Sequence, residues 1–306
     1  MSSYNFFSAK SLLKKEFIEH KTAFLYVPGI LMGLLFLAFF IAVWRNGARF
    51  EAMGNNVVAS GNGFDLFAML YSVSLAIWLG YLTLMLFFYF AASFHVDRKN
   101  NSLLFWKSLP VTDFEIMATK TLAGLTVFPA IIMFWAFLGA IIGYISLNTI
   151  GTISPVISSL NSGTSFWTFI NIQISAMIFI ITSLLWYLPL FAFAGLLGVL
   201  VRNWAVPAFL LIVAMISALE SIMAFSRQGF FEQMIEERLV APFEIIGKMI
   251  VDHNRVFSSE MPEMVSMVEF IPGFLLRVDW LQMVFGWAIA LVFIYIASEY
   301  RRRRIV

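Results

Sequence analysis

Residues 166–201 read FWTFINIQISAMIFIITSLLWYLPLFAFAGLLGVLV, a run of 36 residues without a charged side chain. As one helix this run would be roughly 54 Å long, whereas the hydrocarbon core of a bilayer is about 30 Å thick and needs about 20 helical residues. Two crossings with a turn would need more than about 40 residues. We therefore expect one long membrane span, kinked at Pro189 because proline removes a backbone hydrogen bond.

Five further apolar runs predict additional spans, at 22–44, 66–94, 121–145, 205–222 and 280–297. The composition agrees, because 61% of the 306 residues are hydrophobic and only 12% are charged. That charged share is about half of what a soluble domain carries. The chain has no cysteine, which excludes disulfide bonds and thiol chemistry. The predicted fold class is an all-α integral membrane protein with six transmembrane helices.

The positions of Lys and Arg orient these six spans, since basic residues accumulate on cytoplasmic segments. With the N-terminus inside, the cytoplasmic side carries 13 of the 20 basic residues and six acids, a net +7, and the outer side carries −5. A seventh span would place the arginines at 301–304 outside, against this bias. We therefore expect both termini to be cytoplasmic.

The first 21 residues are expected to form an interfacial amphipathic helix before the first span. Apolar residues recur at helical spacing at positions 6, 9, 13 and 17, while Lys14, Lys15 and Glu16 take other faces. This pattern is typical of a helix that lies among the lipid headgroups. A solvated basic leader is the alternative.

The long outer segment 223–279 has helical periodicity of its own. It contains Pro242, Pro262 and Pro272, and apolar residues repeat between them with helical spacing. Short amphipathic helices here could lie on the outer leaflet or cover a partner, and a small packed cap without a gating role fits equally well. Its charges at 236–238 are interpreted as a solvated run.

No catalytic or metal-binding motif stands out. The histidines, at 20, 95 and 253, are far apart in sequence, and zinc-protease, nucleophile-elbow and P-loop motifs are absent. We expect no catalytic residue, no metal and no cofactor on this chain. Any ATP-driven work would need another subunit.

Span four contains several polar but uncharged residues. No charged residue is expected at mid-membrane in any span. Asn171, Gln173 and Ser175, with Glu220 near the outer end of span five, are candidates for a translocation path; hydrogen bonding between helices is the equally weighted alternative. Gly195 and Gly198 are expected to let another helix approach closely, although their spacing is one residue short of the usual small-xxx-small pattern.

The cytoplasmic segment 95–120 carries the most specific signal. Five large apolar residues fall within seven positions of a segment that should be watery: Leu103, Leu104, Phe105, Trp106 and Leu109. Such a patch is usually covered by a partner or by lipid headgroups. Pro110 would end this short helix, and Thr112 or Asp113 could cap the next.

This segment resembles the corresponding loop of the permease subunits of ABC-2 type transporters. Those loops have an acidic and arginine-containing start, a Ser or Thr before leucine and phenylalanine, and then Ser-Leu-Pro-Val with an acid. The matching residues are Asp97, Arg98, Ser102, Leu103, Phe105, Ser108, Leu109, Pro110, Val111 and Asp113. The basic helix with Lys14, Lys15 and Glu16, the six spans and the long outer segment are also similar. Many relatives have Glu-Arg-Glu and Gly-Thr where this chain has Asp97-Arg98-Lys99 and Asn101-Ser102.

The resemblance implies a type V exporter-like fold with an N-terminal elbow helix, in the bacterial inner or plasma membrane. It implies a transport subunit and not an enzyme, paired with a second copy or a related permease. Two separate ATPase subunits, which bind ATP and Mg, would dock on the segment around Trp106; no nucleic acid is expected. An uncharged path favours export of amphipathic or hydrophobic cargo. A secondary transporter or a membrane-embedded assembly factor independent of ATP is the alternative.

Overall fold

The computed structural model describes residues 13–38, 40, 41, 45, 66–99, 113–153, 166–201, 204–223, 233–244, 275 and 278–304. These residues are almost entirely helical and include no strand, which confirms the all-α prediction. Five helical stretches are long and apolar enough to cross a membrane: Leu13–Ala38, Val73–Ala92, Met117–Thr149, Phe169–Val201 and Trp280–Tyr300. The architecture is that of a multi-pass membrane protein.

The observed helices follow the apolar runs closely but extend beyond several of them. α3 (Leu66–Lys99) and α12 (Trp280–Arg304) continue past the predicted ends of their spans, whereas α8 (Phe166–Val201) has the predicted limits. The predicted third span lies within a continuous helical stretch of α5 (Asp113–Leu122), η2 (Ala123–Val127) and α6 (Phe128–Ile153). Residues 13–38 also form one helix, interrupted only by the wider turn η1 (Thr22–Tyr26), so the boundary expected near residue 21 falls inside it.

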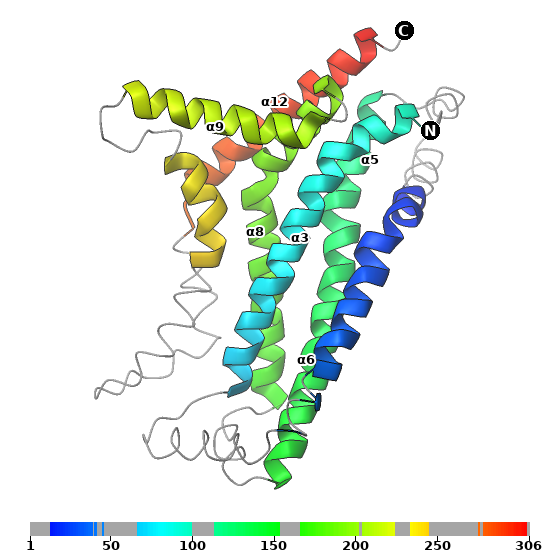
Figure 1. Cartoon of the computed structure of the whole chain (residues 1–306), viewed down its shortest axis with the longest axis vertical. Coiled ribbons are helices and arrows are strands. Elements are labelled where there is room, and N and C mark those ends of the chain that lie inside the picture. Colours follow the sequence, from blue (N-terminus) through cyan, green and yellow to red (C-terminus); the bar gives the residue numbers. More distant parts are fainter. Residues whose placement is uncertain are drawn as a thin grey trace.

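Helices α3, α6, α9 and α12 pack against α8, and helix 13–38 lies beside α6 (Figure 1). On one side of α8, Phe169 lies 5.7 Å from Phe67 and Phe191 lies 5.5 Å from Phe90, measured between ring centroids, so α3 runs parallel to α8. On the other side, Phe193 packs 5.4 Å from Phe293 of α12. The apolar stretch of α8 is the most enclosed of the five. α8 is therefore the central helix.

Close packing at the end of α8 depends on a glycine. A Cβ atom on Gly198 would collide with the carbonyl oxygen of Ala91, so only glycine lets α3 and α8 approach this closely. The predicted role of Gly198 in helix approach therefore agrees with the structure. Its neighbours Ala194 and Leu197 complete this contact with Ala91.

The predicted fifth span forms α9 (Ala205–Met223), whose apolar stretch Ala205–Glu220 is shorter than the five listed above. Figure 1 draws α9 across the end of the bundle instead of along it. Its packing partners Phe87 and Phe193 contact only its first turns, through Ala205, Val206, Phe209 and Ile212. Beyond that point its large apolar residues are exposed, including Met215 and Ile222.

Candidate functional site

Two π-helical turns lie side by side near one end of the bundle. In η1 the N–H of Val27 donates to the carbonyl of Thr22, and in η2 the N–H of Phe128 donates to the carbonyl of Ala123. Both turns end two residues before a proline, at positions 28 and 129. A proline ring clashes with the carbonyl four residues before it and offers no N–H, and the wider turn relieves that clash. The same local sequence feature therefore produces both turns.

The two turns are in direct contact through an aromatic stack. The ring of Phe24 in η1 lies 4.0 Å from that of Phe128, with an angle of 11° between the planes. Farther along, a Cβ of Gly29 would lie 2.9 Å from the Trp135 ring. These contacts run in the same order along both helices, so helix 13–38 and α6 are parallel neighbours.

A buried ion pair lies beside these turns. The Nζ atom of Lys120, in α5, is 2.8 Å from Oε1 of Glu16, and both side chains are almost completely enclosed, at 3% and 2% exposed. The hydroxyl of Tyr89, from α3, donates to Oε2 of Glu16 at 3.0 Å and lies 3.1 Å from the carbonyl oxygen of Lys120. Burying two charges is costly unless they are paired and further hydrogen-bonded, as they are here. We call Glu16, Tyr89 and Lys120 the Glu16–Lys120 cluster.

Aromatic rings close the cluster off from its surroundings. The His20 ring meets Tyr89 edge-on at 4.9 Å and Phe128 at 5.9 Å. Tyr89 also packs 4.9 Å from Phe128. Because water is excluded, the attraction between the two charges is stronger than at a surface. The cluster therefore ties helix 13–38, α3 and α5 together at one point.

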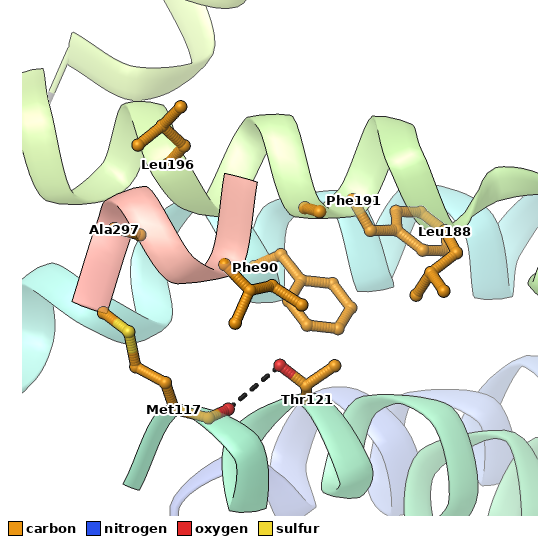
Figure 2. A pocket seen from close by; sticks show the side chains of 9 residues that line it. Phe90, Met117, Thr121, Leu188, Phe191, Leu196 and Ala297 are labelled. Atoms are coloured by element: carbon orange, nitrogen blue, oxygen red, sulfur yellow. Dashed lines mark hydrogen bonds between the residues drawn. The ribbon is translucent and has the colours of Figure 1, made fainter. Parts of the chain in front are cut away.

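A small apolar pocket lies next to this cluster, between α3, α5, α8 and α12 (Figure 2). Phe90 and Thr121, the immediate neighbours of Tyr89 and Lys120, line it, and the Thr121 hydroxyl donates to the carbonyl of Met117 at 2.9 Å. Its volume of about 10 Å³ is close to the minimum needed to hold one water. The pocket cannot hold a transported molecule.

The sequence prediction for the interfacial residues differs from the structure at Glu16. Lys14 is exposed, as expected of a solvated face, whereas Lys15 is only partly exposed, with a buried Nζ atom that lies 3.4 Å from Glu19. Glu16 instead points into the bundle. It shares one helical face with His20 and Phe24, at steps of four residues, and that face is the one that packs. This four-residue spacing is the feature of the sequence from which the inward direction of Glu16 could have been predicted.

The described residues include one group that could hold a metal ion, formed by Glu16, Glu19 and His20, whose ligand atoms lie within 4.8 Å of one another. Lysines already neutralise both carboxylates: Lys120 pairs with Glu16 and Lys15 with Glu19. The arrangement favours ion pairs over a bound cation.

The predicted ATPase-docking residues lie mostly outside the described residues. Asp97 and Arg98 belong to the last turn of α3. The others fall between α3 and α5, in a part of the chain that is not described: Ser102, Leu103, Phe105, Trp106, Ser108, Leu109 and Pro110. α5 begins at Asp113, directly after this segment. Lys120 is therefore ten residues, about three helical turns, from the end of the predicted docking site along the chain.

The candidates for a translocation path do not come together. Gln173 accepts a hydrogen bond from the Tyr71 hydroxyl at 2.9 Å, across α3 and α8. The Ser175 hydroxyl donates to the carbonyl of Asn171 within its own helix, at 2.8 Å. Glu220 lies on α9, which starts from the opposite end of α8. Gln173 thus makes a hydrogen bond between helices, and its Nε2 atom is buried without a hydrogen-bond partner.

The interpretation of residues 236–238 as a solvated run is wrong for Arg238. Glu236 and Glu237 are exposed, but Arg238 is only 8% exposed and its guanidinium lies between α8 and α12. Its helical segment, 233–244, turns Arg238 toward the bundle while its acidic neighbours face outward.

Comparison with known proteins adds no assignment. No family model, curated protein or solved structure matches this chain. Function is therefore inferred from its own residues.

Proposed function

We propose that this chain is the transmembrane permease subunit of an ATP-driven transporter of the ABC-2 type, working as an exporter of amphipathic or hydrophobic cargo. ATP and Mg would be bound by two separate ATPase subunits, and a second permease copy or a related permease would complete the path. The observation that carries the proposal is the Glu16–Lys120 cluster, because it links the segment expected to receive the ATPase to two long apolar helices.

Helix direction supports six spans. Trp287 donates to the carbonyl of Leu185 and Phe293 packs on Phe193, so contacts advance in the same direction along α8 and α12. Two neighbouring parallel spans require the chain to recross the membrane between them. Among the described residues between them, α9 is the long apolar candidate, and its 19 residues would reach about 28 Å. Pivoting at Ala205, where its packing is concentrated, would lay α9 along the bundle.

The cluster offers a route for force transfer. Movement of the docking segment would act directly on α5, and Lys120 would pass it to helix 13–38 through Glu16 and to α3 through Tyr89. A charged pair held in a dry site resists separation, so the three elements should move as a unit. The paired turns η1 and η2 lie one turn farther in and provide a place where both helices can bend together.

Affinity purification of the tagged full chain from its native membranes tests the partner. We expect an ATPase with a Walker A motif to co-purify. Leu103→Asp or Trp106→Ala should reduce its recovery while membrane insertion stays normal, and Asn100→Asp, a polar change in the same segment, should not. Unchanged recovery with both apolar substitutions would contradict the docking assignment. Transport by the purified chain in liposomes, driven by an ion gradient without an ATPase, would instead support a secondary transporter.

A further inference from the structure

Two prolines each leave a backbone carbonyl without its helical donor, and a tryptophan supplies the missing hydrogen bond in both cases. In α8, Pro189 has no N–H for the carbonyl of Leu185. The indole N–H of Trp287, from α12, donates to that carbonyl at 3.1 Å. The hydrogen bond that Pro189 removes from α8 is thus replaced by one from the neighbouring helix.

The second proline lies in segment 233–244. Pro242 cannot donate to the carbonyl of Arg238, four residues earlier. The indole N–H of Trp186, from α8, donates to that carbonyl at 3.1 Å. The hydroxyl of Tyr187 also donates to the carbonyl of Leu239 at 3.0 Å. Adjacent residues of α8 therefore bind adjacent carbonyls of the outer segment.

The Arg238 side chain extends this contact to α12. Its Nη1 donates to the carbonyl of Trp186 at 3.0 Å and its Nη2 to the carbonyl of Gln282 at 2.8 Å. The guanidinium also lies 4.9 Å from the Trp186 ring. A Cβ on Gly286 would lie 2.8 Å from Nη2, so a glycine at that position makes room for the guanidinium. One arginine thus joins α8 and α12.

No carboxylate among the described residues forms an ion pair with Arg238, which sets it apart from the buried Lys120. Burial lowers the pKa of the Arg238 guanidinium, although arginine remains protonated in proteins. A desolvated cation held by neutral carbonyls recovers its hydration when it leaves the site. The geometry of the Arg238 contact is therefore specific, and rehydration of the guanidinium offsets part of the free energy lost when the contact breaks.

We infer that Arg238, with Trp186, is a latch that docks segment 233–244 into the seam between α8 and α12, and that release of this latch opens the seam from the end where α12 begins. Docking holds α8 against α12 beside the proline break of α8, where a helix bends most readily. If the opening serves to release cargo, that role rests on the proposed function. The opening of the seam itself is inferred from the contacts of Arg238 and Trp186 alone.

Because the chain has no cysteine, a single introduced thiol can report the opening. Met283 is 1% exposed, one residue from Gln282 on α12, so Met283→Cys should react slowly with a membrane-impermeant maleimide. Adding Arg238→Gln should raise the labelling rate about tenfold, since a hydrogen bond from a charged group is worth about that much in an equilibrium. Trp186→Phe removes one neutral hydrogen bond and should raise the rate by about two- to tenfold. Glu237→Gln, on the same segment but exposed, should leave the rate unchanged.

A second thiol, Ala136→Cys on α6, separates seam opening from general loosening. Ala136 is 5% exposed and should stay unreactive in every variant. The latch is refuted if both substitutions leave the rate at Met283→Cys unchanged, or if they raise labelling at Ala136→Cys equally. The assay needs neither an ATPase nor a substrate, so failure to find an ATPase partner would overturn the proposed function and leave the latch result standing.

Discussion

Replacing Lys120 by methionine should destabilise the protein strongly, because it leaves the Glu16 carboxylate buried without a counter-charge. The carboxylate is 2% exposed and would keep only the hydrogen bond from Tyr89. Removing one partner of such a pair costs about 3–5 kcal/mol. At about 2 °C per kcal/mol for a chain of this size, the midpoint of thermal unfolding in detergent micelles should fall by about 6–10 °C.

The double variant Glu16→Gln/Lys120→Met distinguishes unpaired charge from lost packing. It removes both charges and keeps an amide for Tyr89 to bond, so most of the lost stability should return. Lys14→Met is the matched control on the same helix, since Lys14 is exposed, and it should change the stability by at most about 0.5 kcal/mol. If the double variant unfolds at the same temperature as Lys120→Met alone, the reasoning from buried charge is refuted.

Three further predictions concern the central helix and its neighbours. Trp287→Phe should lower the free energy of unfolding by about 1 kcal/mol in the parent protein. The loss should be clearly smaller in a Pro189→Ala background, because the alanine at that position has a backbone N–H that can donate to the carbonyl of Leu185. Equal losses in the two backgrounds of this double-mutant cycle would contradict the prediction. Gly198→Ala should lower the free energy of unfolding by about 1–3 kcal/mol, because the added methyl group overpacks against α3. Gly33 has open space around it, so Gly33→Ala should raise the free energy of unfolding by up to about 1 kcal/mol in the same assay. Gln173→Leu should impair transport in vesicles without impairing insertion, and full transport would show that its role is structural.

The sequence predicts the positions of the spans well because their length and lack of charge are properties of contiguous residues. α8 begins and ends where its uncharged run does, and α9 matches its run to within one residue. The ends of α3 and α12 are less predictable, since charged residues continue a helix into the headgroup region as readily as they end it. Hydropathy therefore predicts where the apolar part of α3 and of α12 lies, but not where each helix ends.

The candidate site is less predictable because its members meet only in the folded bundle. Glu16 and Lys120 are 104 positions apart, and their local sequence fits a solvated basic face and a span border equally well. The inward direction of Arg238 is also not predictable from its local sequence, because the two acidic residues before it are exposed and the three together resemble a solvated charge run. The proline at position 28 and the one at 129 were readable signals, because a proline within an apolar span must disturb the turn before it.

The common direction of α3, α8 and α12 has an electrostatic consequence. Their carboxyl-terminal ends lie at the same end of the bundle, and each carries a partial negative charge of about half an electron from the aligned peptide dipoles. The sequence places a basic residue at or just beyond each of these ends: Lys99, Arg202 and Arg304. Cations there are each worth about 0.3–1 kcal/mol to the helix they follow. The basic residues expected to orient the chain in the membrane would therefore also neutralise three aligned dipoles, so removing them should weaken orientation and stability together.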